Sequence, residues 1–259
     1  MYLDGEILYV ADTENHAIRQ VDLSEGTVEN IAGTGKQGEA GGGLRLALSS
    51  ELCSPFDLVK NDGVLYIAMA GVHQLWSMNM EDGMIGPFAG TGGEAITDGP
   101  LLSALLAQPC GITTDGTRLY FVDSETSSVR SADIDPSGRV RTIVGLDLFV
   151  FGDVDGSDHN VRLQHPIGIT HHEGVLYITD TYNHKIKRVL PTTRSAFTVL
   201  GSGLAGHVDG PSDQTQFSEP SGIGIAHGKI YIADTNNHAV RVADVESGVV
   251  STLEVAGLR

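Results

Sequence analysis

The chain has 259 residues, of which 33 are acidic and 16 basic, so its formal net charge at pH 7 is −17. This balance argues against nucleic-acid and anionic-membrane partners, because both attract clustered Lys and Arg. The two cysteines, Cys53 and Cys110, form no CxxC pair, and no long apolar run or leader sequence indicates a membrane span or export. We therefore expect a cytoplasmic globular protein.

An internal repeat organises the chain. Five tyrosine-led segments follow one another at intervals of 57, 54, 57 and 54 residues: YVADTENHAIR (9–19), YIAMAGVHQLW (66–76), YFVDSETSSVR (120–130), YITDTYNHKIK (177–187) and YIADTNNHAVR (231–241). Four of them follow proline-led segments, at 55–59, 109–113, 166–170 and 220–224. We divide the chain into units of about 1–45, 46–92, 93–145, 146–203 and 204–259, all within one domain.

Each unit predicts four short strands: the proline-led segment, the tyrosine segment, the segment after the histidine, and the segment before a glycine-rich turn such as NIAGTG (30–35). The strands are rich in β-branched residues and lack polar alternation, which suits sheets that pack on both faces. The predicted fold is therefore all-β, a β-propeller of four-stranded antiparallel blades. A linear solenoid of the same units is the alternative.

The first unit differs from the others because no proline-led segment precedes Tyr9. We expect this unit to lack its opening strand. Either the ring closes without that strand, or upstream sequence has been lost, and we favour the second because proteins usually cover exposed strand edges. An unfinished blade could also pair with the edge of a second copy, which would give a homo-oligomer.

The second unit replaces polar residues of the motif with apolar ones. Met69 stands where other units have aspartate, and Trp76 stands where they have Arg19, Arg130 or another basic residue. If these side chains are exposed, they form an apolar patch that indicates a partner site. If they are buried, they simply pack between blades.

The segment from Gly152 to Asp158, near the start of the fourth unit, carries three aspartates, Asp153, Asp155 and Asp158, spaced like part of a calcium loop. It lacks the downstream glutamate of an EF-hand, so it is a weak candidate for a structural cation. Apart from that cation, we expect no cofactor.

The runs Asn15-His16-Ala17, Asn183-His184-Lys185 and Asn237-His238-Ala239 resemble the NHL repeat, which is named for Asn-His-Leu. The order of the variant units is similar to the propeller of thioredoxin-like, NHL-repeat-containing proteins. This resemblance implies a six-bladed propeller preceded by a thioredoxin-like domain. The present sequence would then lack that domain, the first blade and the opening strand of the second.

Binding is expected on one face of the propeller. Strand direction alternates within a blade, so the connection from second to third strand shares a face with the long loop that leads to the next blade. Long loops on a rigid scaffold are typical binding sites, and we expect a protein or peptide partner there rather than catalysis. The candidate face comprises Asp12, His16, Met69, His73, Trp76, Asp123, Asp180, His184, Asp234 and His238. Alternatively, these recurrent polar residues only stabilise their own turns.

Two other functions stay open at this stage. One is a metal-dependent lyase or hydrolase with a cation in the central channel, although no HExxH, GxSxG or Walker A motif occurs in the sequence. The other is RNA binding, known for some NHL propellers, which would require a basic face that this acidic chain is not expected to have.

Overall fold

The structure, a computed structural model, describes residues 1–254. Its strands form five antiparallel sheets, which we number as blades 1 to 5 in chain order. Within each blade, consecutive strands pair side by side, from the innermost strand outwards.

The blades have the following strands. Blade 1 contains β1 (Tyr2–Asp4), β2 (Ile7–Asp12), β3 (Ala17–Asp22) and β4 (Thr27–Ala32). Blade 2 contains β6 (Pro55–Asn61), β7 (Val64–Met69), β8 (Gln74–Asn79), β9 (Met84–Ala89) and the short outer strand β5 (Arg45–Leu46). Blade 3 contains β11 (Pro109–Thr114), β12 (Arg118–Asp123), β13 (Ser128–Asp133), β14 (Arg139–Val144) and the outer β10 (Gly99–Pro100). Blade 4 contains β16 (Ile169–His172), β17 (Val175–Asp180), β18 (Lys185–Leu190), β19 (Ser195–Leu200) and the outer β15 (Gly156–Ser157). Blade 5 contains β20 (Pro220–Ala226), β21 (Lys229–Asp234), β22 (Ala239–Asp244) and β23 (Val250–Thr252).

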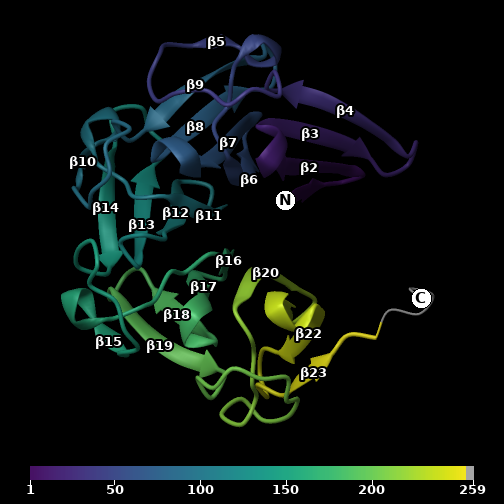
Figure 1. The fold of residues 1–259 in the computed structure, drawn as a ribbon, viewed down its shortest axis with the longest axis vertical. Coiled ribbons are helices and arrows are strands. Elements are labelled where there is room, and N and C mark those ends of the chain that lie inside the picture. Colours follow the sequence, from purple (N-terminus) through teal and green to yellow (C-terminus); the bar gives the residue numbers. More distant parts are fainter. Residues whose placement is uncertain (255–259) are drawn as a thin grey trace.

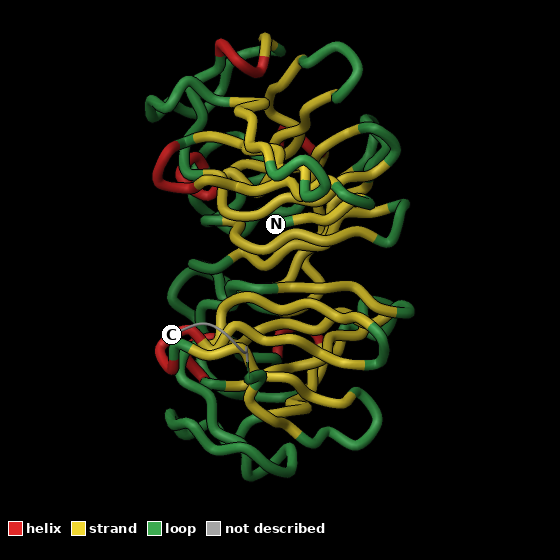
Figure 2. The backbone as a smooth tube through the Cα atoms, turned by 90° about the vertical axis from the view of Figure 1, so that its right-hand side faces the viewer, coloured by secondary structure: helices red, strands yellow, loops and turns green. Residues whose placement is uncertain are grey.

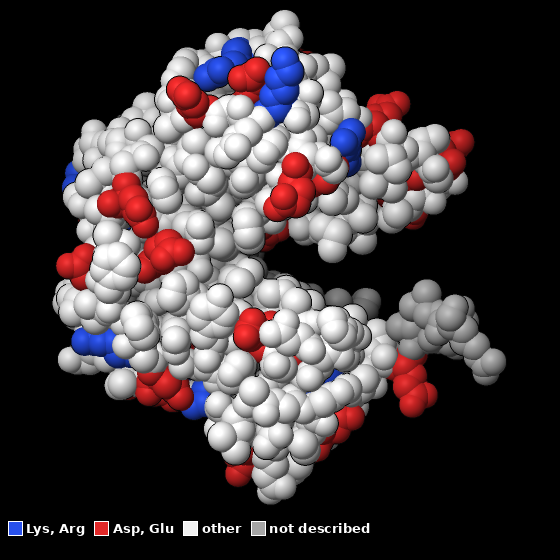
Figure 3. Space-filling model, in the orientation of Figure 1, with Lys and Arg blue, Asp and Glu red and all other residues white. Residues whose placement is uncertain are grey.

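The blades lie around a common centre and form an arc that is open between blade 1 and blade 5 (Figure 1). The innermost strands β6, β11, β16 and β20 contact one another in that order, and the space-filling view shows the same opening (Figure 3). This arrangement confirms the predicted propeller and excludes a linear stack.

The opening strand of blade 1 corrects one prediction. Residues Tyr2–Asp4 form β1, which pairs with β2 so that Tyr2 lies opposite Tyr9. The prediction that the first unit lacks this strand was wrong, because a three-residue strand without a leading proline is enough to begin the hairpin at Gly5, where φ is +60°. Blade 1 therefore has four strands, and the premise for pairing through an unfinished blade is lost.

Apolar side chains fill the interfaces between blades. Between blades 2 and 3, Tyr66 and Leu75 pack against Ile112, Leu119 and Phe121, all of which are buried. Fully burying one such side chain stabilises the fold by about 1.5–3 kcal/mol. Because these sheets are covered on both faces, their strands read as continuous apolar runs without polar alternation.

Four segments, residues 33–54, 90–108, 145–165 and 201–219, connect successive blades, and we call them the long loops. Gly33 has a φ of +96°, and a Cβ atom there would lie 2.3 Å from the carbonyl oxygen of His16. At Gly201 the φ is +100° and the corresponding distance, to the His184 carbonyl oxygen, is 2.7 Å. Only glycine fits at these positions, so each loop leaves its blade against the turn between the second and third strands.

The long loops therefore share one side of the disc with these turns. In the side view, most loops and 3-10 turns gather on one side and the short hairpin turns on the other (Figure 2). The turns between second and third strands and the long loops therefore share a face, as the sequence predicted.

Candidate functional site

The recurrent motif folds into a tight turn between the second and third strands. In blade 4 this is the 3-10 turn η6 (Thr181–Asn183), closed by a hydrogen bond from the His184 backbone N–H to the Thr181 carbonyl. His184 itself adopts the left-handed conformation, with a φ of 55°. The turns η1 (Thr13–Asn15), η3 (Ala70–Val72) and η7 (Thr235–Asn237) repeat this geometry, ending at His16, His73 and His238.

Three of these histidines bind the next blade. The Nδ1 atom of His184 accepts a hydrogen bond from the backbone N–H of Glu219, at 3.1 Å. Two equivalent bonds run from Ser54 to His16 and from Gln108 to His73. Each acceptor Nδ1 must be unprotonated, so a neutral ring carries its proton on Nε2. In blade 3, Ser127 replaces the histidine, and its hydroxyl accepts the N–H of His165 instead.

The donors of these bonds are themselves strained. Ser54, Gln108, His165 and Glu219 all have positive φ angles, between 48° and 63°, and each precedes a proline. A residue before proline is normally extended, and a non-glycine residue at positive φ costs about 1–3 kcal/mol. The bond from the previous blade stabilises this conformation. The structure thus gives His16, His73 and His184 a local structural role, while His238 makes no such bond within residues 1–254.

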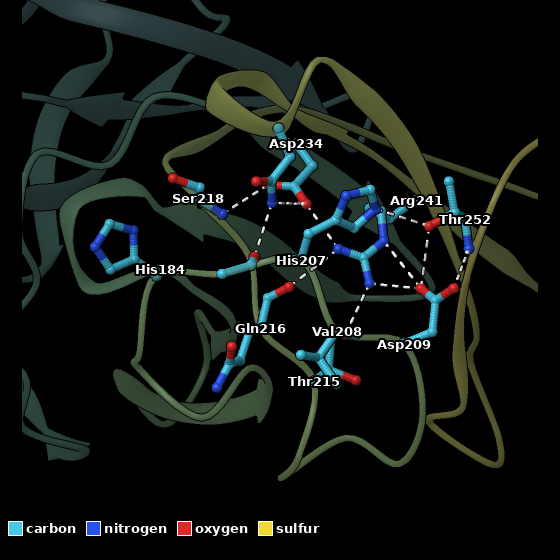
Figure 4. A network of polar contacts seen from close by, with 12 residues as sticks. His184, His207, Val208, Asp209, Thr215, Gln216, Ser218, Asp234, Arg241 and Thr252 are labelled. Atoms are coloured by element: carbon cyan, nitrogen blue, oxygen red, sulfur yellow. Dashed lines mark hydrogen bonds and ion pairs between the residues drawn. The ribbon is translucent and has the colours of Figure 1, made fainter.

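A buried ionic network fixes the long loop to its blade, as Figure 4 shows for blade 5. The Arg241 guanidinium is fully buried; it binds Asp234 at 2.7 Å and Asp209, in the long loop, at 2.6 Å. Its remaining donors reach the carbonyl oxygens of Val208 and Gln216, so all five N–H groups are used. Saturation of this kind is what a buried charge requires.

Three other blades contain versions of this network. In blade 3, Arg130 binds Asp123 at 2.9 Å and Asp98 at 3.1 Å. Blade 1 keeps only the pair of Arg19 and Asp12, at 3.0 Å. In blade 4 the basic residue is Lys187. Asp98 and its equivalents in the other loops also accept a backbone N–H from the fourth strand of the blade: the pairs are Asp98 with Thr142 in β14, Asp155 with Thr198 in β19, and Asp209 with Thr252 in β23.

In blade 4 one ammonium group serves three carboxylates. Lys187 Nζ lies 2.7 Å from Asp153, 2.8 Å from Asp155 and 3.6 Å from Asp180. Burial raises the pKa of Asp180 to about 6, and the hydrogen bond from Asn183 and the positive charge of Lys187 offset this rise only in part. Burial also acts to raise the pKa of Asp153 and Asp155, but it is outweighed at Asp153 by hydrogen bonds from Lys185 and Lys187, and at Asp155 by those from Lys187 and Thr198, so both pKa values are lowered. The most buried carboxylate is therefore the one that takes up a proton.

These contacts also show how the three aspartates of the weak cation candidate are used in the structure. Asp153 and Asp155 bind Lys187, whereas Asp158 pairs with Arg194 at 3.0 Å. The three aspartates do not converge, because each has a basic partner from a neighbouring strand or hairpin. Within residues 1–254, no three His, Cys, Asp or Glu side chains are grouped as a metal site would require.

Blade 2 replaces the ionic network with buried apolar packing. Met69 and Trp76 are 0% and 1% exposed, so they form no surface patch, and of the two alternatives the one in which they pack between blades holds. Gln74 supplies the polar bonds here. Its side chain donates to the Gly90 carbonyl at 2.9 Å and accepts the Trp76 indole N–H at 3.0 Å. The substitutions therefore repack the blade interior.

Burial limits what the candidate face can present. Asp123, Asp180 and Asp234 are 0% exposed, so these carboxylates cannot contact a partner directly. Accessible apolar side chains lie instead on the long loops: Leu44, Leu46, Leu48, Leu102, Leu146, Phe149, Phe151, Val154, Leu204 and Val208. They make up half of the exposed large apolar side chains among the described residues. The periodic motif predicted the polar residues of the turns and did not indicate these exposed loop residues.

The inner strands line a central cavity of about 830 Å³. Its wall is largely apolar, with Phe56, Ile112 and Ile223 among its residues. The Asp57 carboxylate also lines it, and accepts the Ile112 backbone N–H at 3.2 Å. The cavity therefore offers a largely apolar surface. The Asp57 carboxylate in its wall is already bonded to the next blade.

Comparisons with known proteins agree with this architecture. The family model described as NHL repeat matches residues 217–243. Protein SUPPRESSOR OF QUENCHING 1, chloroplastic, of Arabidopsis thaliana is 41% identical over 98% of this chain and 25% of its own length. NHL repeat-containing protein 2 of Gallus gallus is 39% identical over 98% of this chain and 39% of its own length. The human protein of that name is 37% identical over 97% of this chain and 39% of its own length.

Solved structures support the fold alone, because their identities to this chain are low. An auxiliary nutrient binding protein from Bacteroides ovatus superposes with a TM-score of 0.67 at 15% identity, covering 98% of this chain and 55% of that one. A streptogramin B lyase gives 0.60 at 12% identity, covering 99% and 67%. None of the helices in the described part of the chain has the length and apolar character needed to traverse a bilayer.

The chain thus spans between a quarter and two fifths of the length of the relatives named above. Its repeats, its blades and its similarity to these relatives over nearly all of its length lead to one assignment. The chain is a five-bladed β-propeller that contains an NHL repeat at residues 217–243 and is similar to NHL repeat-containing proteins over nearly all of its length.

Proposed function

We propose that this propeller is a non-catalytic scaffold that binds a protein or peptide partner through the long loops. One observation carries the proposal: half of the exposed large apolar side chains in residues 1–254 lie on these four segments. Apolar side chains exposed together on connecting loops are typical of an interaction surface.

The long loops are held in place before any partner arrives. In the first loop, the backbone N–H groups of Gly33 and Thr34 bind the carbonyls of Ala47 and Ser50, each at 3.0 Å. The ionic networks fix the later loops to their blades, as Asp209 does through Arg241. A surface that is already ordered loses less conformational entropy on binding, which favours affinity.

The chemistry of the repeated motif also supports a scaffold. Its aspartates neutralise buried bases, and the Nδ1 atoms of three of its histidines accept backbone N–H groups, so these atoms already serve the fold. For the metal-dependent alternative, no ligand set is found among the described residues. The likeness to a streptogramin B lyase concerns the fold only.

Site-specific photo-crosslinking tests the proposal. A photoreactive p-benzoylphenylalanine would replace Phe149, which is 80% exposed on the third long loop, in cells that naturally produce the protein. The control replaces Leu23, which is 49% exposed in the hairpin between β3 and β4 on the opposite side. We expect a discrete protein adduct at Phe149 and none at Leu23. Equal labelling at both positions, or none at either, would contradict the proposal.

A further inference from the structure

Four side chains from blades 3 and 4 meet at the surface of the long-loop side. We call Glu125, Phe151, His165 and Tyr182 the boundary cluster. The centroid of the His165 ring lies 5.0 Å from that of Tyr182 and 6.2 Å from that of Phe151. The Glu125 carboxylate lies 3.7 Å from Nε2 of His165. Phe151 is 51% exposed and Tyr182 47%, so the cluster presents aromatic surface with a carboxylate beside it.

Backbone bonds hold the members of the cluster in place. The N–H of Glu125 binds the Ala107 carbonyl, and the N–H of Tyr182 binds the Gln164 carbonyl, both at 3.2 Å. His165 is the residue whose N–H binds Ser127 across the blade boundary. Asn183 donates to the carbonyl of Gly152, which follows Phe151 directly. The rings and the carboxylate are therefore positioned by the blade framework and not by one another.

Blade 5 shows that the fold does not require these rings. It makes the same backbone bonds, from Gly206 to Phe217 and from Asn236 to Ser218, as blade 4 makes from Gly152 to Leu163 and from Tyr182 to Gln164. At the positions of Phe151, His165 and Tyr182 it has Ala205, Glu219 and Asn236. Small or polar residues thus suffice to build a blade boundary. The backbone bonds of the boundary therefore do not depend on exposed aromatic side chains at these positions.

The polar groups of the cluster lack partners. Within the described chain, the Glu125 carboxylate pairs with no Lys or Arg, in contrast to the aspartates of the ionic networks. Nδ1 of His165 is buried and has no hydrogen-bond partner among residues 1–254. Acidic side chains outnumber basic ones on the face seen in Figure 3, in line with the net charge of −17. A chain with this net charge attracts cations.

We propose that the boundary cluster binds an arginine side chain of a basic peptide segment in the partner protein. A guanidinium group stacks on the aromatic faces of Tyr182 and Phe151 and donates hydrogen bonds to the Glu125 carboxylate. Cations held within about 6 Å of an aromatic ring are attracted by its face, and the planar guanidinium adds stacking and paired donors that an ammonium lacks. This inference rests on the proposed function, since it assigns a chemistry to one part of the same surface.

The test uses a short peptide with two arginines separated by glycine, and a matched peptide with citrulline, which is neutral and of nearly equal shape. Binding to the purified chain is followed by NMR chemical-shift changes. We expect the arginine peptide to shift resonances of Tyr182 and His165, and the citrulline peptide to bind at least fivefold more weakly. Equal binding of the two peptides, or shifts confined to other residues, would overturn the proposal.

Two variants locate the site. The double substitution Phe151→Ala with Tyr182→Asn installs the residues of blade 5, so the blade should still fold, and its circular dichroism melting curve checks this. We expect it to abolish the shifts at His165. Glu125→Gln should weaken arginine-peptide binding at least threefold. The matched control is Glu14→Gln, because Glu14 occupies the same turn position in blade 1. If Glu14→Gln lost as much arginine-peptide affinity as Glu125→Gln, the effect would come from the change in net charge, and the proposed site would be refuted.

The two proposals fail separately. If a partner crosslinks at Phe149 but the double variant binds that partner as tightly as the native chain, this inference is wrong and the proposed function stands. If the arginine peptide binds the cluster but no protein crosslinks at Phe149, the proposed function is wrong while the cation site is real.

Discussion

The imidazole of His184 accepts the backbone N–H of Glu219 at 3.1 Å, across the boundary between blades 4 and 5. Both residues have positive φ angles, of 55° and 49°, so the bond joins two strained points of the chain. The same bond recurs at earlier boundaries, with Ser127 in the place of histidine once. The histidine of the repeat therefore joins neighbouring blades, which explains its recurrence without any catalytic role.

The first prediction tests this bond. Replacing His184 by alanine should lower the free energy of unfolding by about 1–2 kcal/mol more than replacing His238 by alanine, because it leaves the Glu219 N–H without its acceptor. The two histidines have φ angles of 55° and 51°, so the cost of alanine in the left-handed conformation cancels in the comparison. Denaturant unfolding followed by circular dichroism measures both variants.

Equal losses for the two histidine variants would show that the backbone conformation, and not the bond between blades, accounts for the effect. A variant His184→Asn provides a further check. Asparagine tolerates the left-handed conformation well but its side chain is too short to replace the ring, so it should recover only the strain part of the loss.

The second prediction concerns the glycines that start the long loops. Gly201→Ala should destabilise the protein by about 1–3 kcal/mol more than Gly228→Ala. Both glycines have positive φ angles, of +100° and +71°, but an added Cβ would lie 2.7 Å from the His184 carbonyl oxygen at Gly201 and would meet nothing within 4 Å at Gly228. Melting temperatures of the two variants give the comparison. A similar loss in both would mean that the close approach relaxes freely.

The propeller itself could be predicted from the sequence because its determinants are local and repeated. Each unit carries its own strand segments. The glycine that starts a long loop is required by its close approach to the preceding turn, as at Gly33, which lies against the His16 carbonyl oxygen. The opening strand of blade 1 could not be predicted in this way. Tyr2–Asp4 lacks the leading proline of the other units, and only its pairing with β2 identifies it.

The surface of the site was harder to predict, because accessibility depends on neighbours that the repeat does not specify. Met69 and Trp76 read as a patch but are buried by adjacent blades, and Asp153 and Asp155 read as cation ligands but face Lys187. One signal for the boundary cluster was present in the sequence. Tyr182 is aromatic at a turn position where the other units have Glu or smaller residues.

The third prediction concerns pH and the three carboxylates around Lys187. The pKa of Asp180 is raised by burial to about 6, from an ordinary value of 3.8. The folded state therefore holds this proton more tightly than the unfolded state, so the stabilisation is fully present below pH 3.8 and is lost as the pH rises through about 6. We expect the difference in unfolding free energy between the native chain and Asp180→Asn to fall by up to about 3 kcal/mol between pH 4 and pH 7.

Asp155 supplies a control of opposite sign. Its pKa is lowered, because the hydrogen bonds from Lys187 and Thr198 outweigh the effect of burial. Its contribution is therefore present above pH 3.8 and is lost as the pH falls below that value. Denaturant unfolding at several pH values should show the advantage of the native chain over Asp155→Asn shrinking towards acid. The same trend in both variants would contradict the assignment of the proton to Asp180.

The fourth prediction concerns the buried pair of Asp234 and Arg241. Arg241→Met should cost about 3–5 kcal/mol, because it leaves the Asp234 carboxylate buried without a counter-charge. The double variant Asp234→Leu with Arg241→Met removes both charges. We expect it to be more stable than the sum of the two single losses implies, by about 1–3 kcal/mol. The four proteins of this cycle are compared by denaturant unfolding.

Blade 2 gives the physical reason to expect that recovery. It has Met69 and Trp76 at the two equivalent positions, both buried, so an apolar pair is compatible with the packing of a blade. What the apolar pair cannot do is bind the long loop, which Arg241 holds through Asp209 at 2.6 Å. Limited proteolysis within residues 201–219 should therefore be faster in the double variant than in the native chain. Additive single losses, or an unchanged proteolysis rate, would show that the charges neither depend on each other nor fix the loop.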